Sequence, residues 1–174
     1  MYRIDSYKVS IMMNCFNGDK YLEEAIQSVI SQTYKNWELI FWDNRSFDNS
    51  AKIFKSFKDK RLKYYLAPHH TGLGHARKNA FERTKGELIA ILDVDDIWFP
   101  DKLQKQVNCF KDPDVGIVIS NVNYFNQKRK KKKFSTVPPS GYVFDELLSE
   151  YYIVESSQII KRSFIEMLGY DYDP

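Results

Sequence analysis

Three carboxylates close an apolar run in the middle of the chain. Residues 88–96 read LIAILDVDD, which places Asp93, Asp95 and Asp96 directly after a stretch that is typical of a strand buried on both faces. Acids this close together repel one another unless a cation or a set of hydrogen-bond donors neutralises them. Ligands bind at the carboxyl ends of the strands in an open α/β sheet. The acids therefore indicate a binding site, and their oxygens are the ligands that Mg²⁺ and Mn²⁺ prefer.

Polar residues also close the two first apolar runs, Val9–Met13 and Trp37–Trp42. These residues are Asn14, Asn17, Asp43 and Asn44. If the strands are parallel, all of these side chains meet the three acids at one edge of the sheet. Arg77 and Lys78, on a helix just before the acid-tipped strand, add cations that suit a phosphate. Together the groups suit a nucleoside diphosphate and a divalent ion.

Apolar strands alternate with helical patterns, which is typical of a parallel sheet with crossover helices. The expected strands are 9–13, 37–42, 62–66, 88–92, 115–120 and 158–160. The expected helices are one that follows Asp19 and continues to Ile30, one that starts at Asp48 or Ser50 and continues to Phe57, and 75–84, 100–110, 144–148 and 164–168. Asp19 can cap the first helix, and the Gly-containing stretch 68–74 reads as a loop. The predicted class is α/β, with a mainly parallel sheet flanked by helices and a small antiparallel part near the C-terminus.

The segments 122–125 and 134–137 flank six consecutive basic residues, Lys128–Lys133, and together they predict a hairpin with the basic run at its tip. A solvated tip is one reading of this run. The other is a peripheral contact with an anionic membrane surface, to which each basic residue contributes about 1 kcal/mol. The run has no interleaved aromatic residues, so nucleic acid is not an expected partner.

Composition supports one ordinary globular domain. The 174 residues are 43% hydrophobic and 28% charged, with a net charge of only +3. Cys15 and Cys109 lie far apart and predict neither a zinc site nor a disulfide framework. There is no signal-peptide core at the N-terminus and no apolar run long enough to span a bilayer. We expect a cytoplasmic protein, with the inner face of the membrane as the location if the basic run binds lipid.

Several ordered motifs make the chain resemble family 2 glycosyltransferases, closely over about the first 125 residues and loosely after them. These motifs are Val9–Ile11 with Phe16 and Asn17, Tyr21–Val29, Ser31–Tyr34, Glu38–Ile40 through Asp43, Gly72–Ala80, Lys85–Glu87, Asp93–Trp98 and Pro100–Leu103. The resemblance implies the GT-A fold and inverting transfer of a sugar from a nucleotide-sugar donor to a hydroxyl. It also implies a donor-binding portion over residues 1–125, with the start of the acceptor-side portion of the same domain over 126–174.

Carried over residue by residue, the resemblance assigns roles to seven positions. The donor-binding residues are Asn14, Phe16, Asp43, Asn44, Arg77, Asp93 and Asp95. Asp93 and Asp95 match the family's DxD motif, which holds the ribose and a Mg²⁺ or Mn²⁺ ion on the diphosphate. Arg77 matches an arginine that faces the diphosphate. The remaining four match positions beside the base.

Two positions depart from the family pattern. Asn44 stands where the second member of an acidic pair is usual, and an amide can donate as well as accept, so it reads a base less decisively. Met13 and Asn14 replace the usual proline before the first turn. Uridine is the first choice of base, with a UDP-sugar as donor and a glycan or lipid-linked acceptor, as in the synthesis of a surface polysaccharide.

The catalytic residue is not assigned. Inverting transfer requires a group that takes the proton of the acceptor. In the family this group lies beyond a segment that resembles Gly169–Asp171, so it is expected past Pro174. Asp171 and Asp173 are the only late acids and are not favoured. We expect the chain as given to bind a nucleotide-sugar with metal but to transfer sugar poorly.

Alternatives remain for single residues. The three acids could cap a helix, Arg77 could be a solvated charge, and Asp43 could form an Asx turn after its strand. Trp98 could line the acceptor site or cover the core, and core positions are predicted for Tyr21, Phe54 and Phe57. The three histidines fit no familiar zinc spacing and are expected at the surface; they are His69, His70 and His75.

Two other functions compete with the glycosyltransferase. A non-catalytic nucleotide-binding or scaffolding protein on the same fold would explain Asn44 and the missing base. A nucleotidyltransferase ranks below both, because the segment 14–18 is not the Gly-rich basic loop that such enzymes place after the first strand.

Overall fold

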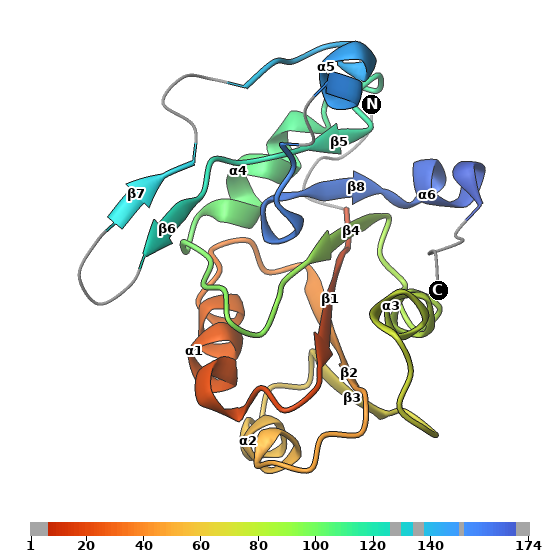
Figure 1. The fold of residues 1–174 in the computed structure, drawn as a ribbon. Helices are drawn as coiled ribbons and strands as arrows, with labels where there is room; N and C mark the ends of the chain where they lie inside the picture. The colour runs from red at the N-terminus through yellow and green to blue at the C-terminus, as the bar shows by residue number, and fades with distance from the viewer. Residues whose placement is uncertain (1–6, 126–129, 134–137, 150–151, 170–174) are drawn as a thin grey trace.

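The computed structural model describes residues 7–125, 130–133, 138–149 and 152–169, and a six-stranded sheet runs through it (Figure 1). The strands are β1 (Val9–Cys15), β2 (Trp37–Asp43), β3 (Leu62–Leu66), β4 (Leu88–Ile91), β5 (Ile117–Val118) and β8 (Ile159–Lys161), with β6 (Asn123–Phe125) and β7 (Lys130–Lys132) in a separate ribbon. The sheet order is β3-β2-β1-β4-β8-β5. The first four strands are mutually parallel, whereas β8 runs antiparallel to both of its neighbours. The predicted α/β class with a mainly parallel sheet is confirmed.

Helices cover both faces of this sheet. They are α1 (Asp19–Ile30), α2 (Ser50–Ser56), α3 (Leu73–Phe81), α4 (Lys102–Cys109), α5 (Phe144–Ser149) and α6 (Arg162–Leu168), with a short 3₁₀ helix, η2 (Glu155–Ser157). Residues of α1, α2 and α4 share one apolar cluster with β1, and residues of α3 share a second cluster on the other face. Figure 1 shows α1 and α3 on opposite sides of β1.

The two apolar clusters explain the unbroken hydrophobic runs of the central strands. Along β1, Ile11 and Met13 enter the first cluster and Met12 enters the second, and all three side chains are at most 1% exposed. A strand covered on both faces has no solvent side on which to alternate polar residues. The parallel register of β1 with β2 and β4 then fixes where each run ends relative to the others.

Some predicted boundaries and burials are wrong. The strand expected at 115–120 reduces to the two residues of β5, and Ile117 is 40% exposed because β5 lies at the edge of the sheet. Helix α3 begins at Leu73 inside the predicted loop, since Gly72 already takes the N-cap position. Gly18, rather than Asp19, is the N-cap of α1.

The core predictions for aromatic residues are confirmed in part. Phe54 belongs to the buried core, and Phe57 packs against it. Tyr21 is wrong as a core residue: it is 45% exposed near the start of α1, with the Lys20 ammonium 4.7 Å from its ring centroid. Trp98 is 5% exposed and donates from its indole nitrogen to the Ser156 carbonyl oxygen (2.8 Å), which favours its core role.

The predicted hairpin exists, but with a different second strand. Lys130–Lys132, expected at the tip, pair as β7 with Asn123–Phe125 of β6. Backbone pairing does not depend on the side chains, so a run of lysines can form one strand of a two-stranded ribbon, and lysine is common in edge strands. The expected strand 134–137 and the first two residues of the basic run lie outside the described residues.

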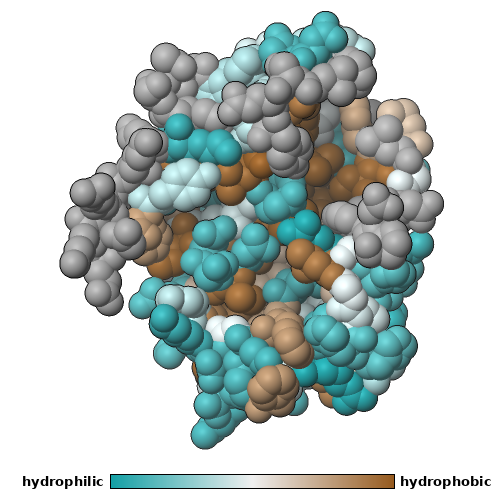
Figure 2. Space-filling view, in the orientation of Figure 1, coloured by the Kyte–Doolittle hydropathy of each residue, from teal (hydrophilic) through white to brown (hydrophobic). Residues whose placement is uncertain are grey.

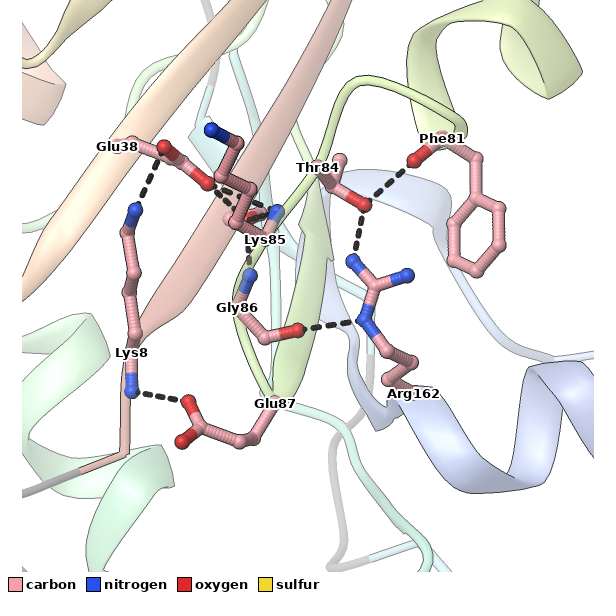
Figure 3. A network of polar contacts seen from close by, with 9 residues as sticks. Lys8, Glu38, Phe81, Thr84, Lys85, Gly86, Glu87 and Arg162 are labelled. Atoms are coloured by element: carbon pink, nitrogen blue, oxygen red, sulfur yellow. Dashed lines mark hydrogen bonds and ion pairs between the residues drawn. The ribbon is translucent and has the colours of Figure 1, made fainter.

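A polar network joins the strands at the amino edge of the sheet, opposite the expected site (Figure 3). The carboxylate of Glu38 in β2 accepts from the Ser10 hydroxyl (2.7 Å) and the Lys85 backbone N–H (2.9 Å), and it forms an ion pair with Lys8 (2.7 Å). These bonds outweigh burial, which alone would raise the pKa of Glu38, and the pKa is lowered. The network fixes the turn before β4, where Gly86 donates to Ser10 (2.8 Å).

Arg162 of α6 closes the same network from the other side. Its guanidinium donates to the Gly86 carbonyl oxygen (2.8 Å) and to the Thr84 hydroxyl, which itself donates to the Phe81 carbonyl oxygen (2.6 Å) (Figure 3). The end of α3 is thereby tied to the start of β4 and to the last described helix.

Among the described helices, none has the length and apolar character that crossing a membrane requires.

Candidate functional site

The carboxyl ends of β1, β2 and β4 lie side by side. Cys15 at the end of β1 pairs with Asp43 at the end of β2, and Met12 of β1 pairs with Ile91 of β4. The Met12 carbonyl oxygen accepts from the backbone of Leu92 (3.0 Å), which extends the alignment up to the three acids. The sheet therefore presents the polar strand ends along one edge.

Arg77 of α3 faces the first of these acids. One of its terminal nitrogens lies 3.8 Å from Asp93 Oδ1 and another lies 3.8 Å from Glu155 Oε2. The Arg77 side chain is only 14% exposed. Arg77 is thus held over the acid-tipped strand, and the alternative of a solvated surface charge is wrong.

The acids occupy an environment that opposes their charge. Burial raises the pKa of Asp93, the nearby Arg77 lowers it, and Asp96, Asp95 and Glu155 raise it again, with a net rise. Asp96 turns back on the strand end and donates its backbone N–H to the Asp93 carbonyl oxygen (3.1 Å). Asp95 is exposed. A bound cation would relieve the repulsion among these carboxylates.

The acid cluster fits a divalent ion that is completed by a substrate. Within the described ranges no three His, Cys, Asp or Glu side chains gather closely enough to form a metal centre, and this covers His69, His70 and His75. A Mg²⁺ ion that binds together with a phosphorylated substrate usually has one or two carboxylate ligands from the protein, and its other ligands are phosphate and water oxygens. Asp93, at the end of the strand, and the exposed Asp95 match that ligand set.

Two buried donors at the same edge have no hydrogen-bond partner among the residues that the structure describes. They are Asn14 Nδ2 at the end of β1 and Trp42 Nε1 in β2. The two residues are register partners on adjacent strands, so their side chains emerge on one face, and Trp42 packs in the cluster that α3 covers. An unpaired buried donor costs about 1–3 kcal/mol. Asn14 therefore has an N–H available for a ligand on the α3 side.

Both carboxylate oxygens of Asp43 already accept hydrogen bonds within the protein. Its Oδ1 accepts from the Ser46 backbone N–H (2.7 Å), and its Oδ2 accepts from the Tyr64 hydroxyl (2.6 Å). Burial, together with the bond to Asp43, raises the pKa of Tyr64 above its usual range. The bond to Ser46 reaches the N–H three residues on, whereas an Asx turn uses the N–H two residues on, so the Asx turn considered as an alternative for this residue is not formed by this bond. Contact with a base would use only the oxygen lone pairs that these two bonds leave.

Asn44 fastens the loop before α3. Its side-chain N–H donates to the Thr71 carbonyl oxygen (2.7 Å), and its Oδ1 accepts from the Thr71 backbone N–H (3.1 Å) and hydroxyl (3.3 Å). The Asn44 carbonyl oxygen lies 3.0 Å from His70 Nδ1. An aspartate could not donate to Thr71, so the departure from the family pattern has a structural reason here.

Phe16 lies in a small aromatic group above these strand ends. Its ring centroid is 4.3 Å from that of His70 and 5.9 Å from that of Phe47, and Phe16 remains 47% exposed. Asn17, with a positive φ of 56°, bridges the two loops by accepting from the Phe47 backbone N–H (2.9 Å). The arrangement leaves apolar ring surface open beside His70, as contact with a base requires.

Sequence reasoning missed Glu155 and Ser156. Both belong to η2, directly before β8, and Ser156 Oγ accepts from the Asp93 backbone N–H (3.1 Å). Their proximity to the acids depends on β8 inserting antiparallel beside β4. No spacing in the sequence signals that insertion, whereas the strand ends of β1, β2 and β4 are visible as polar breaks in apolar runs.

Curated relatives of this chain are glycosyltransferases. It is 30% identical over 169 residues to the UDP-Glc:alpha-D-GlcNAc-diphosphoundecaprenol beta-1,3-glucosyltransferase WfgD of Escherichia coli, covering 97% of the chain and 66% of WfgD. It is 32% identical over 178 residues to an uncharacterized glycosyltransferase of Methanocaldococcus jannaschii, covering 97% of the chain and 60% of that protein. The chain thus spans about two thirds or less of these relatives.

Solved structures share the fold at lower identity. TarS of S. aureus, in complex with UDP-GlcNAc, matches with a TM-score of 0.77 and 18% identity over 92% of this chain and 47% of that one. The mannosyltransferase PcManGT of Pyrobaculum calidifontis, in complex with GDP-Man and Mn²⁺, matches with a TM-score of 0.70 and 22% identity over 95% and 48%.

These structural neighbours are GT-A glycosyltransferases, so the expected GT-A fold is confirmed. The family model described as glycosyl transferase family 2 matches residues 10–168, nearly the whole described chain. The predicted resemblance is therefore correct, and this chain belongs to glycosyl transferase family 2.

Proposed function

We propose that this chain binds a nucleotide-sugar and serves the transfer of its sugar to a hydroxyl acceptor, with inversion at the sugar carbon. The observation that carries the proposal is the position of Arg77, held 3.8 Å from Asp93 at the carboxyl edge of the sheet. A cation and a cluster of acids at that edge suit a diphosphate and its divalent ion. Family membership and the names of the relatives support the same reaction.

In this proposal each group contacts one part of the donor. Arg77 contacts the diphosphate, Asn14 donates its free N–H to the donor, and Phe16 packs against the base. Asp93 and Asp95 would hold a Mg²⁺ or Mn²⁺ ion, whose chemistry is to offset the negative charge that develops on the leaving diphosphate. Asn44 acts indirectly, by positioning the loop that leads to α3.

UDP is the proposed nucleotide. WfgD is named for UDP-Glc, and TarS has been solved with UDP-GlcNAc and with UDP, whereas PcManGT was solved with GDP-Man. Calorimetric titration of UDP, GDP, CDP and dTDP in the presence of Mn²⁺ tests the base. We expect UDP to bind at least about tenfold tighter than the other three, a difference of about 1.4 kcal/mol.

A matched pair of variants separates this proposal from a scaffold that does not bind nucleotide. Arg77→Met removes the proposed diphosphate contact, and Arg83→Met removes an exposed guanidinium just after the same helix. We expect the first to weaken UDP binding by about 2 kcal/mol, as for loss of a charge-assisted contact, and the second to leave it unchanged. Equal affinity of both variants for UDP would refute the proposed Arg77 contact, whereas no UDP binding by the unchanged chain would favour the scaffold.

The proposed acceptor is a glycan or a lipid-linked glycan, in keeping with the diphosphoundecaprenol-linked substrate in the name of WfgD. The proposed location is the cytoplasm, at the inner face of a membrane. The basic run 128–133 supports such a contact, because each basic residue near an anionic surface contributes about 1 kcal/mol. Flotation with vesicles that contain anionic lipid, compared with neutral vesicles, tests the contact.

A further inference from the structure

A large cavity opens beside the acid-tipped turn. Its volume is about 790 Å³, and it lies between the segment 96–101, α4, β6 and η2. Four large apolar side chains that line it are exposed: Ile97 (46%), Phe99 (62%), Tyr124 (54%) and Phe125 (60%). In Figure 2, brown and tan surface emerges beside the β6–β7 hairpin and in the hollow next to it. This exposed apolar lining favours an occupant with an apolar part.

One buried cation also lines the cavity. Lys102, the first residue of α4, is only 8% exposed, and its ammonium lies 4.3 Å from the centroid of the Trp98 ring. Its hydrogen-bond partner is Gln106 Oε1, one turn along the helix. Gln106 is itself fixed, because its Nε2 donates to the carbonyl oxygens of Ser157 (2.8 Å) and Val118 (3.1 Å). The ammonium is therefore held in place by neutral groups.

Within the described part of the chain, no carboxylate pairs with Lys102. Asp101 forms its ion pair with Lys105 instead (2.5 Å), and both of these side chains are at least half exposed. Burial without a counter-charge lowers the pKa of Lys102 to about 7. A buried lysine in this situation gains most from an anion that enters the cavity.

Two residues that line the cavity, Asp96 and Ser156, connect it to the proposed donor site. Asp96 borders the cavity and, through its backbone, closes the turn on Asp93. Ser156 also borders the cavity and accepts from the Asp93 backbone N–H. A molecule in this cavity thus lies next to the edge where the donor is proposed to bind.

We propose that the cavity binds an amphipathic phosphate ester, with the phosphate at Lys102 and the apolar part against Phe99, Tyr124 and their neighbours. This inference rests on the proposed function and deepens it, since such a molecule would be the acceptor or its lipid-linked portion. The phosphate restores the missing counter-charge of the ammonium, and the apolar lining contacts the chain of the ester. Lys102 is then the residue that makes the site prefer an anionic acceptor.

The test uses the whole chain and three probes, of which one carries both proposed features of the ligand and the other two carry one feature each. Octyl phosphate carries both proposed features, octan-1-ol carries only the apolar chain, and inorganic phosphate carries only the anion. Calorimetry at pH 7 is expected to show octyl phosphate binding roughly tenfold or more tighter than either of the others, as for a charge-assisted contact added to apolar burial. Similar affinities for octyl phosphate and octan-1-ol would overturn the role of Lys102.

Two variants with the same change of charge localise the effect. Lys102→Met keeps the length and apolar body of the side chain and is expected to abolish the preference for octyl phosphate over octan-1-ol. Lys111→Met, at an exposed position beyond α4, is expected to preserve it. Preference retained in Lys102→Met would refute the proposal. If that variant does not fold, octyltrimethylammonium with the unchanged chain decides, since binding as tight as that of octyl phosphate refutes an anion site.

UDP titration of the same proteins separates this inference from the proposed function. If UDP does not bind while octyl phosphate shows the predicted preference, the cavity assignment stands and the donor assignment fails. If UDP binds and the preference is absent, the donor assignment stands and the cavity assignment fails.

Discussion

Replacing Glu38 by glutamine removes the charge on which the amino-edge network of Figure 3 depends. The carboxylate is 8% exposed and accepts from Ser10 and Lys85 at 2.7 and 2.9 Å, while Lys8 lies 2.7 Å away. Hydrogen bonds to a charged acceptor contribute about 1.5–3 kcal/mol and neutral ones about 0.5–1.5. Glu38→Gln turns two charged hydrogen bonds into neutral ones and weakens the contact with Lys8, but it also removes the cost of burying a charge. The net loss in the free energy of unfolding is about 2 kcal/mol.

The pH dependence gives the same prediction a second test. The pKa of Glu38 is lowered in the folded chain, so its contribution is complete above the unfolded pKa and is lost as pH falls through the folded pKa. The stability gap between the unchanged chain and Glu38→Gln should therefore close below about pH 4. Urea unfolding followed by tryptophan fluorescence at pH 7 and at pH 3 measures it.

A control on the same edge tests whether the effect belongs to the buried carboxylate. Glu87 is exposed and accepts from the Lys8 backbone N–H (2.8 Å), so Glu87→Gln should cost less than about 1 kcal/mol. Equal losses in both variants, or a Glu38→Gln gap that stays constant with pH, would refute the electrostatic reasoning.

Three further variants test single contacts. A Cβ on Gly86 would lie 2.6 Å from the backbone nitrogen of Ser10, so Gly86→Ala should cost about 3 kcal/mol in urea unfolding, whereas Gly72→Ala meets nothing within 4 Å and should cost far less. Asn44→Asp removes the N–H that its side chain donates to the loop before α3 and should lower the unfolding free energy by about 1–3 kcal/mol in thermal melts at pH 7. Asp93→Asn should raise the free energy of unfolding at pH 7 but not at pH 3. Burial raises the pKa of Asp93, so ionising this carboxyl at neutral pH destabilises the folded chain, and the substitution removes that cost. The gain stays below about 1 kcal/mol because the side chain is 44% exposed. A lower melting temperature for Asp93→Asn at pH 7 would contradict this sign.

The central strands and the gathering of strand ends were predictable from the sequence. Long apolar runs with polar breaks mark β1, β2 and β4, and parallel pairing then brings Asn14, Asp43 and Asp93 to one edge. The position of Arg77 followed from the helix that precedes the acid-tipped strand. These inferences depend on local patterns and on one general rule of sheet topology.

Features that depend on tertiary packing were not predictable. The antiparallel insertion of β8 rests on three residues and places Glu155 beside Arg77 without any periodic signal. Lys102 reads as an ordinary residue at a helix start, and its burial follows from the packing of α4 against Trp98. The role of Asn44 depends on a contact with Thr71, 27 residues away.

The central claim is that Asp93 and Asp95 bind the nucleotide together with a divalent ion. Titrating UDP with and without Mn²⁺, into the unchanged chain and into Asp95→Asn, tests it most directly. We expect Mn²⁺ to tighten UDP binding by roughly tenfold or more in the unchanged chain, and Asp95→Asn to lose that gain. Equal affinity for UDP with and without Mn²⁺ in the unchanged chain would contradict the claim.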